Sequence, residues 1–98
     1  MICADTSAEG IYISSSYNDY NVEQFTTCVI PFVVYNTEDE VSNVDLLVNG
    51  TIVNSLVNVD SSEHYWSYKA TNYGTIILTI QSGEAFKNIT LNVWNKLY

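Results

Sequence analysis

The chain has 98 residues, of which 47% are hydrophobic and 14% are charged, and its formal net charge is −8. That length has room for one domain. Nucleic acids and anionic membranes bind surfaces rich in lysine and arginine, and this chain has three such residues against eleven acidic ones. The composition argues against both partners. No segment approaches the ~20 apolar residues that span a bilayer, and residues 1–10 do not resemble a signal peptide, so we expect no membrane insertion.

The first half of the chain predicts one short strand and one long strand. Residues 1–10 form a loose lead-in, residues 11–14 a short edge strand and residues 15–18 a polar turn. Residues 22–35 are the most strongly β segment of this half, with apolar side chains on both faces. Pro31 interrupts that segment and has no amide hydrogen to donate, so we expect a bulge or a sheet edge there.

The middle of the chain predicts a β-hairpin after an acidic loop at residues 36–42. Residues 44–48 and 51–59 have strand character and flank Asn49 and Gly50. Asparagine and glycine tolerate the positive φ angles that a two-residue type I′ turn needs. We therefore place a tight turn at these two residues.

Three more strands follow a turn at residues 60–63. The first is the aromatic segment at residues 65–68. A turn that ends at Gly74 precedes an apolar strand, and a hairpin joins that strand to a final one over residues 86–94.

About seven strands, with turn signals every 8–12 residues, predict an all-β, immunoglobulin-like β-sandwich. We expect it to occupy residues 1–98 as a single domain, and a small closed barrel is the alternative. The predicted core consists of the inward-facing residues Cys28, Phe32, Leu46, Val48, Trp66, Tyr68, Ile76, Leu78, Ile80, Ile89, Leu91 and Val93.

His64 is the only histidine in the sequence and the candidate for a catalytic base. Asp60, Ser61, Ser62 and Glu63 precede it directly. Catalysis needs a nucleophile and an orienting carboxylate that converge with the imidazole, and neighbours along one turn rarely do so. The sequence also lacks a nucleophile elbow. We therefore expect no enzymatic activity and interpret His64 as a surface residue at the start of a strand.

The two cysteines do not match the disulfide of antibody domains, and with one histidine they supply too few ligands for zinc. We expect Cys3 and Cys28 to be reduced, with Cys28 in the core, and a bridge between them is the alternative. The acidic residues 38–40 lack the spacing of a calcium-binding loop and are interpreted as a solvated loop. No cofactor is expected.

Tyrosines and strand edges are the predicted contact surfaces. Tyrosine is enriched in protein interfaces, and an unpaired strand edge can accept a strand from a partner. Tyr12, the pair Tyr17 and Tyr20, and the strand interrupted by Pro31 are therefore candidate partner contacts, and we expect the tyrosine pair to be exposed. The net charge of −8 disfavours self-association, so we expect the isolated domain to be a monomer.

The second half also carries a more specific pattern of apolar, aromatic and glycine positions. Its elements are Val44, Leu46, Val48 and Gly50, then Val59-Asp60, Trp66-Ser67-Tyr68, Gly74-Thr75 with Ile76, Leu78 and Ile80, and finally Lys87, Ile89, Leu91 and Val93. This pattern, which covers about half of the chain, resembles the immunoglobulin-like domains of tailed-phage structural proteins.

The resemblance implies a non-enzymatic virion protein assembled in the host cytoplasm: a capsid decoration, a neck or tail accessory, or the anchoring module of a fibre. Its implied partners are other virion proteins or host-surface molecules. The alternative is a cell-surface adhesin or carbohydrate-binding module, which would be an extracellular part of a larger secreted protein.

Overall fold

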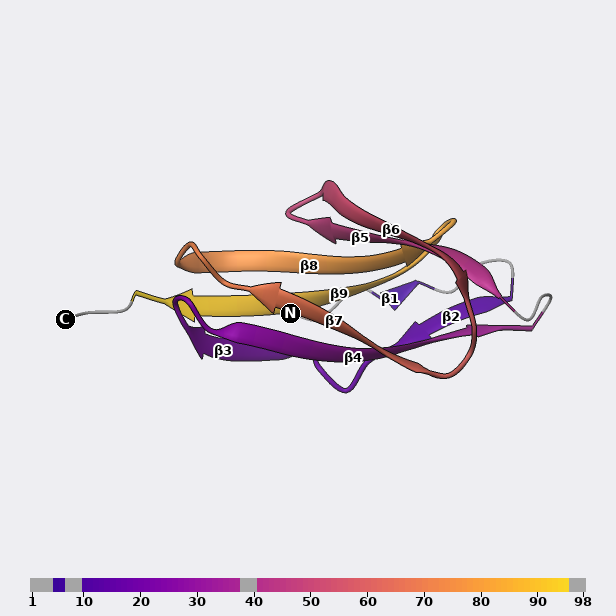
Figure 1. Ribbon diagram of the computed structural model, residues 1–98, viewed down its shortest axis with the longest axis horizontal. Helices are drawn as coiled ribbons and strands as arrows, with labels where there is room; N and C mark the ends of the chain where they lie inside the picture. The colour runs from indigo at the N-terminus through magenta and orange to yellow at the C-terminus, as the bar shows by residue number, and fades with distance from the viewer. Residues whose placement is uncertain (1–4, 7–9, 38–40, 96–98) are drawn as a thin grey trace.

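The computed structural model describes residues 5–6, 10–37 and 41–95, and these residues form two β-sheets without a helix (Figure 1). The strands are β1 (Asp5–Thr6), β2 (Ile11–Ser14), β3 (Asp19–Glu23), β4 (Thr27–Asn36), β5 (Ser42–Val48), β6 (Thr51–Val59), β7 (Glu63–Lys69), β8 (Gly74–Ser82) and β9 (Ala85–Trp94). One sheet has the order β1-β9-β8-β5-β6, with β3 also paired to β9, and the other has the order β2-β4-β7. The predicted all-β sandwich is confirmed, with nine strands in the described residues where the sequence indicated about seven.

The predicted hairpin at Asn49 and Gly50 is confirmed. Val48 pairs with Thr51, so the loop has two residues, and φ is 49° at Asn49 and 86° at Gly50. Both angles are positive, as a type I′ turn requires. The Asn49 side-chain oxygen accepts a hydrogen bond from the Ile77 amide at 2.8 Å, which ties the turn to β8.

The predicted strand over residues 22–35 is wrong in one respect, because the chain breaks it at residues 24–26 and changes sheets. β3 runs parallel to β9, whereas β4 pairs with β2 and β7 in the other sheet. Phe25 lies in the break with a φ of 74°, and its amide donates a hydrogen bond to the Ala70 carbonyl at 2.6 Å. Positive φ is unfavourable for a bulky residue, so this contact stabilises the turn. The apolar pattern continues through the break and does not reveal it.

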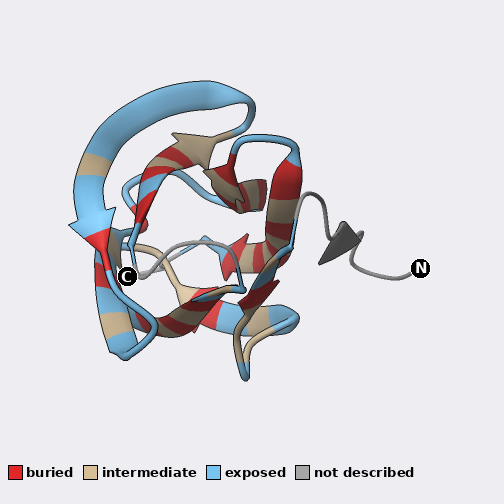
Figure 2. Ribbon diagram, turned by 90° about the vertical axis from the view of Figure 1, so that its right-hand side faces the viewer, coloured by how far each residue is buried: buried red, intermediate tan, exposed pale blue. Residues whose placement is uncertain are grey.

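The core lies between the two sheets, where β4, β8 and β9 bury alternate residues (Figure 2). Most of the predicted core residues are buried, namely Cys28, Phe32, Leu46, Trp66, Ile76, Leu78, Ile80, Ile89, Leu91 and Val93. Val48 and Tyr68 are half-buried instead. They pack against the core but also line a groove that is open to solvent, which is why their burial is incomplete.

Cys28 is a free and buried thiol, and burial raises its pKa. Cys3 lies outside the described residues, as do the acidic residues 38–40 and most of the lead-in over residues 1–10. The extent of the single domain over residues 1–98 stays a prediction.

Lys87 is buried, which the sequence reasoning did not anticipate. It shares the inward-facing side of β9 with Ile89 and is 4% exposed. Its ammonium group donates a hydrogen bond to the side-chain oxygen of Asn18, 69 residues away in sequence. Burial of an ammonium group requires such polar partners in place of water. This contact therefore fastens the turn before β3 to the interior side of β9.

Candidate interaction surfaces

Aromatic and apolar side chains gather on the solvent side of the β2-β4-β7 sheet, which we call the outer face. β4 buries its even-numbered residues from Cys28 to Val34, so its odd-numbered residues point outward. Cross-strand partners share a face of the sheet. The apolar and aromatic residues of the outer face are therefore Tyr12, Val29, Pro31, Val33, Tyr35 and Tyr65.

The tyrosine pair of the outer face lies beyond the last β4–β7 register pair, Val33 and Glu63, near the Glu63 end of β7. Tyr12 and Tyr35 are each 48% exposed, and their rings stack with centroids 6.0 Å apart and planes 22° apart. A cross-strand aromatic pair stabilises the sheet and restrains both rings. The two charged side chains of β7, Glu63 and Lys69, stand at the two ends of that strand. Enrichment of tyrosine is typical of a protein interface.

Pro31 lies at a local sheet edge without a bulge, but the expectation that its strand offers an edge to a partner is wrong, because β4 lies between β2 and β7. Pro31 pairs with Tyr65 in a β4–β7 register that continues without interruption on both sides. On the other side of β4, pairing with β2 ends at Ser14 and Val33. Beyond that point the Ser15 hydroxyl donates a hydrogen bond to the Pro31 carbonyl at 2.6 Å. Proline has no amide hydrogen to donate, and on this side of β4 no strand of the described residues is present to accept a hydrogen bond at Pro31.

The expected exposure of Tyr17 and Tyr20 is wrong, because both rings are half-buried against the core. They stack with centroids 4.7 Å apart. The charge of ionised Tyr17 raises the pKa of Tyr20, and burial, Cys28 and a hydrogen bond with Tyr17 raise it further. The structure thus places Tyr12 and Pro31 on the outer face and uses Tyr17 and Tyr20 to cover the core.

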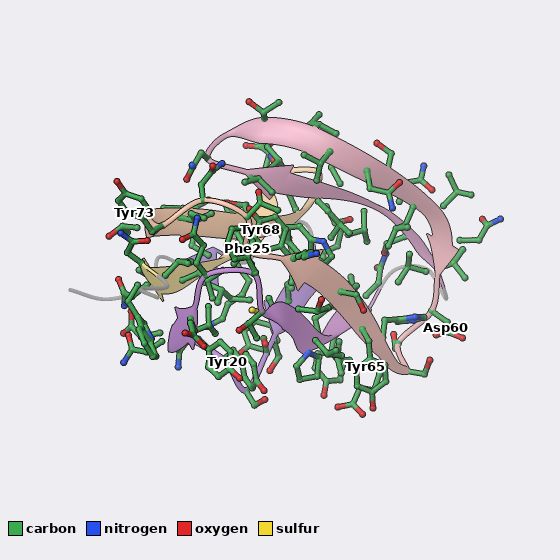
Figure 3. All side chains as sticks on the ribbon, turned by 60° about the vertical axis from the view of Figure 1, so that its left-hand side comes forward. Tyr20, Phe25, Asp60, Tyr65, Tyr68 and Tyr73 are labelled. Carbon is green, nitrogen blue, oxygen red and sulfur yellow. The ribbon has the colours of Figure 1, made fainter. Side chains whose placement is uncertain are left out.

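Asp60, which Figure 3 labels at the corner between β6 and β7, contacts Ser62 and His64. The Asp60 carboxylate accepts hydrogen bonds from the Ser62 hydroxyl at 2.5 Å and the Ser62 amide at 3.1 Å, and it lies 2.9 Å from His64 Nε2. In a catalytic triad the serine bonds to one imidazole nitrogen and the carboxylate to the other. Here Ser62 donates to the carboxylate, and the same nitrogen of His64 faces both groups.

This cluster stabilises a turn. Hydrogen bonds from Ser62, followed by the contact with His64, lower the pKa of the Asp60 carboxyl. The Asp60 and Ser62 pattern is that of an Asx turn, in which the aspartate side chain bonds the backbone two residues later. The arrangement explains how the chain leaves β6 and enters β7 in the other sheet.

No group of three or more His, Cys, Asp or Glu side chains in the described part of the chain could hold a metal ion. Over the same residues, no helix is long and apolar enough to cross a membrane.

A groove between β6 and β7 was not predicted from the sequence. The two strands follow one another in the chain but form edges of different sheets. β6 is the long, exposed strand that arches away from the body in Figure 2. Side chains of β5, β6 and β7 line a groove of about 500 Å³. A signal for this was present, because residues 51–59 have apolar side chains at both parities and no charge. The apolar and aromatic residues that line the groove are Leu46, Val48, Val53, Leu56, Tyr65, Trp66 and Tyr68.

No protein-family model and no curated protein matches the sequence. Among solved structures, the fold is similar to the fibronectin(III)-like modules of Clostridium thermocellum CbhA, with a TM-score of 0.60 and 13% sequence identity. The similarity covers 92% of this chain and 50% of that structure, so the chain spans half of its length. This likeness shows that the chain has the fold of an immunoglobulin-like β-sandwich, similar to fibronectin(III)-like modules.

Proposed function

We infer that this chain is a non-catalytic interaction module that acts through protein–protein contacts. The observation that carries this inference is the outer face, where Tyr12 and Tyr35 form an exposed stacked pair on a hydrogen-bonded sheet. Rigid tyrosines offer contact area with little loss of side-chain entropy on binding. A stable contact at this face buries on the order of 1,000 Å² or more in total.

The finer proposal is that the module belongs to a virion, as a capsid decoration, a neck or tail accessory, or the anchor of a fibre. The support for it is the resemblance of the second half to immunoglobulin-like domains of tailed-phage structural proteins. A particle also suits a module of this kind, because each weak contact is repeated in a symmetric assembly and the total avidity is high.

A second candidate is a cell-surface adhesin or carbohydrate-binding module within a larger protein. The observation that favours it is the likeness to fibronectin(III)-like modules, in a structure of which this chain covers 50%. In this reading the stacked Tyr12 and Tyr35 rings receive the apolar face of a sugar instead of a protein surface.

One experiment separates the two candidates. The tagged chain is produced in the cells that form the particles, and its distribution between purified particles and the soluble fraction is measured. Tyr12→Ser combined with Tyr35→Ser removes the stacked pair. Tyr73→Ser is the control because Tyr73 is also exposed, at 62% against 48% for each ring of the pair, but lies outside the outer face. Each variant is also tested against immobilised glycans.

The proposal predicts that the wild type and the Tyr73 variant sediment with particles, whereas the double variant loses at least about ten-fold of its particle association. Equal loss in the control, or no association of the wild type, contradicts the proposed virion role. Glycan binding that the double variant loses and the control keeps establishes the second candidate instead.

A further inference from the structure

β7 presents a regular and unpaired strand edge to the groove. Its register with β4 runs without a shift from Thr27 opposite Lys69 to Val33 opposite Glu63. Within the described residues, β7 pairs with β4 alone. Its other edge therefore has backbone amides and carbonyls that can accept a further strand.

The opposite wall of the groove is a poorer template. β6 pairs with β5 through two register shifts, and each places an extra residue in β6. The shift between Ser42 and Val44 lies opposite Asn58, whose φ is 56°. Bulges of this kind twist an edge strand away from further pairing. An incoming strand will therefore pair with β7 and use β6 as a side wall.

The side chains below the β7 edge determine which residues of the incoming strand face inward. Trp66 is 7% exposed and Tyr68 is half-buried, with ring centroids 6.3 Å apart in an edge-to-face arrangement. Figure 3 shows Tyr68 and Tyr65 on opposite sides of β7. In an added strand, the residues opposite Trp66 and Tyr68 would point toward Leu46 and Leu56 on the far wall of the groove. We therefore expect these residues of the added strand to be apolar.

In an antiparallel strand, the charges of β7 determine which end of the incoming segment is acidic and which is basic. Lys69 stands at one end of β7 and Glu63 at the other. The residues between them include no other Asp, Glu, Lys or Arg. Asp60 adds negative charge at the Glu63 end, and the Glu63 carboxylate lies 2.6 Å from the hydroxyl of Tyr65, which lines the groove. In antiparallel pairing the first residue of the incoming strand meets Lys69 and the last meets Glu63.

We propose that the β6–β7 groove binds an extended segment of a partner protein, which adds to β7 as an antiparallel strand. The segment begins with an acidic residue, ends with a basic residue and has apolar residues at the alternate positions between them. This inference deepens the proposed function and rests on its premise that the partner is a protein. The groove volume of about 500 Å³ lies in the range of ordinary binding pockets, about 300–1,000 Å³.

The test uses two peptides of identical composition with blocked termini. Glu-Val-Thr-Val-Thr-Val-Lys matches the charges along β7, and Lys-Val-Thr-Val-Thr-Val-Glu reverses them. Binding is followed by the fluorescence of Trp66 in a Trp94→Phe background, because Trp94 is 58% exposed and would mask the signal. Backbone pairing is measured by hydrogen exchange of the β7 amides.

We expect the matched peptide to bind about ten-fold more tightly than the reversed one at low salt and to slow exchange along β7. The preference declines in 1 M salt because the charge pairs are exposed. The variant that combines Glu63→Lys with Lys69→Glu keeps the net charge and should reverse the preference. Both residues are exposed, so this variant is expected to fold.

Equal affinity for the two peptides, protection of another strand, or no binding overturns the inference. Protection of β7 at high protein concentration without peptide, together with a dimer in sedimentation, also overturns it, because the occupant is then a second copy of the chain. If neither peptide binds but the variant lacking Tyr12 and Tyr35 still loses its particle association, the groove is not a peptide-binding site. The proposed function then remains in place.

Discussion

Replacement of Trp66 by alanine tests whether the two sheets form one cooperative core. Trp66 is 7% exposed, lies opposite Ile30 in the β4–β7 ladder and contacts Tyr68 edge to face. Burial of a tryptophan removes roughly 150–250 Å² from water. At about 25 cal/mol per Å² this corresponds to about 4–6 kcal/mol, which is an upper estimate because the unfolded chain is not fully extended.

The groove beside Trp66 lowers the expected loss. The space that the indole leaves is continuous with a groove open to solvent, so water enters it and no sealed cavity forms. We therefore expect Trp66→Ala to reduce the free energy of unfolding by about 3–5 kcal/mol. A domain of this length has about 5–15 kcal/mol in total, so the variant retains a small margin or none.

Urea unfolding monitored by far-ultraviolet circular dichroism measures this loss. Trp94→Ala is the matched control, since Trp94 is 58% exposed at the end of β9 and should cost about 1 kcal/mol or less. Trp66→Phe should fall between the two. If Trp66→Ala and Trp94→Ala unfold at the same urea concentration with the same slope, Trp66 does not connect the sheets and the burial argument is refuted.

Two further predictions concern the turns. Gly50→Val should destabilise the domain by about 1–3 kcal/mol in the same assay, because φ is 86° at this position. The site has room for a side chain, so the cost comes from the backbone angle, and Gly50→Asn should cost less. Equal stability of the wild type and both variants would contradict the type I′ turn. Hydrogen bonds from Ser62 hold the pKa of Asp60 below its ordinary value. They therefore stabilise the folded state fully above the unfolded-state pKa of about 3.9, and this stabilisation is lost as the pH falls through the folded-state pKa. Ser62→Ala should raise the Asp60 pKa in an NMR titration, and an unchanged value would show that the Ser62 contact is absent in solution.

The local geometry of the sheets was accessible from the sequence. Alternation of apolar residues assigned Ile76, Leu78 and Ile80 to the buried face, and the structure buries all three. The dipeptide at Asn49 and Gly50 predicted a two-residue turn because few residues adopt two successive positive φ angles. These features depend on neighbours within a few positions, so a local pattern is sufficient to predict them.

The partner of each strand depended on contacts that no local pattern contains. Residues 22–35 look like one strand, but the turn at Phe25 sends β3 to β9 and β4 to β7. Lys87 has the parity of a core residue and the chemistry of a surface one, and its long-range contact with Asn18 accompanies its burial. The half-burial of Tyr17 has the same origin, since the core that it covers is built from distant strands.

The candidate sites show the same division. Tyr12 was predicted from its residue type, but its stacking partner Tyr35 became evident from the β2–β4 register. The groove is a property of two edges, because β6 and β7 are adjacent in the chain and belong to different sheets. A sequence encodes which face of a strand is apolar through its period of two, whereas the neighbour at each edge is selected by the packing of the whole sandwich. That selection was decided by the tertiary structure alone.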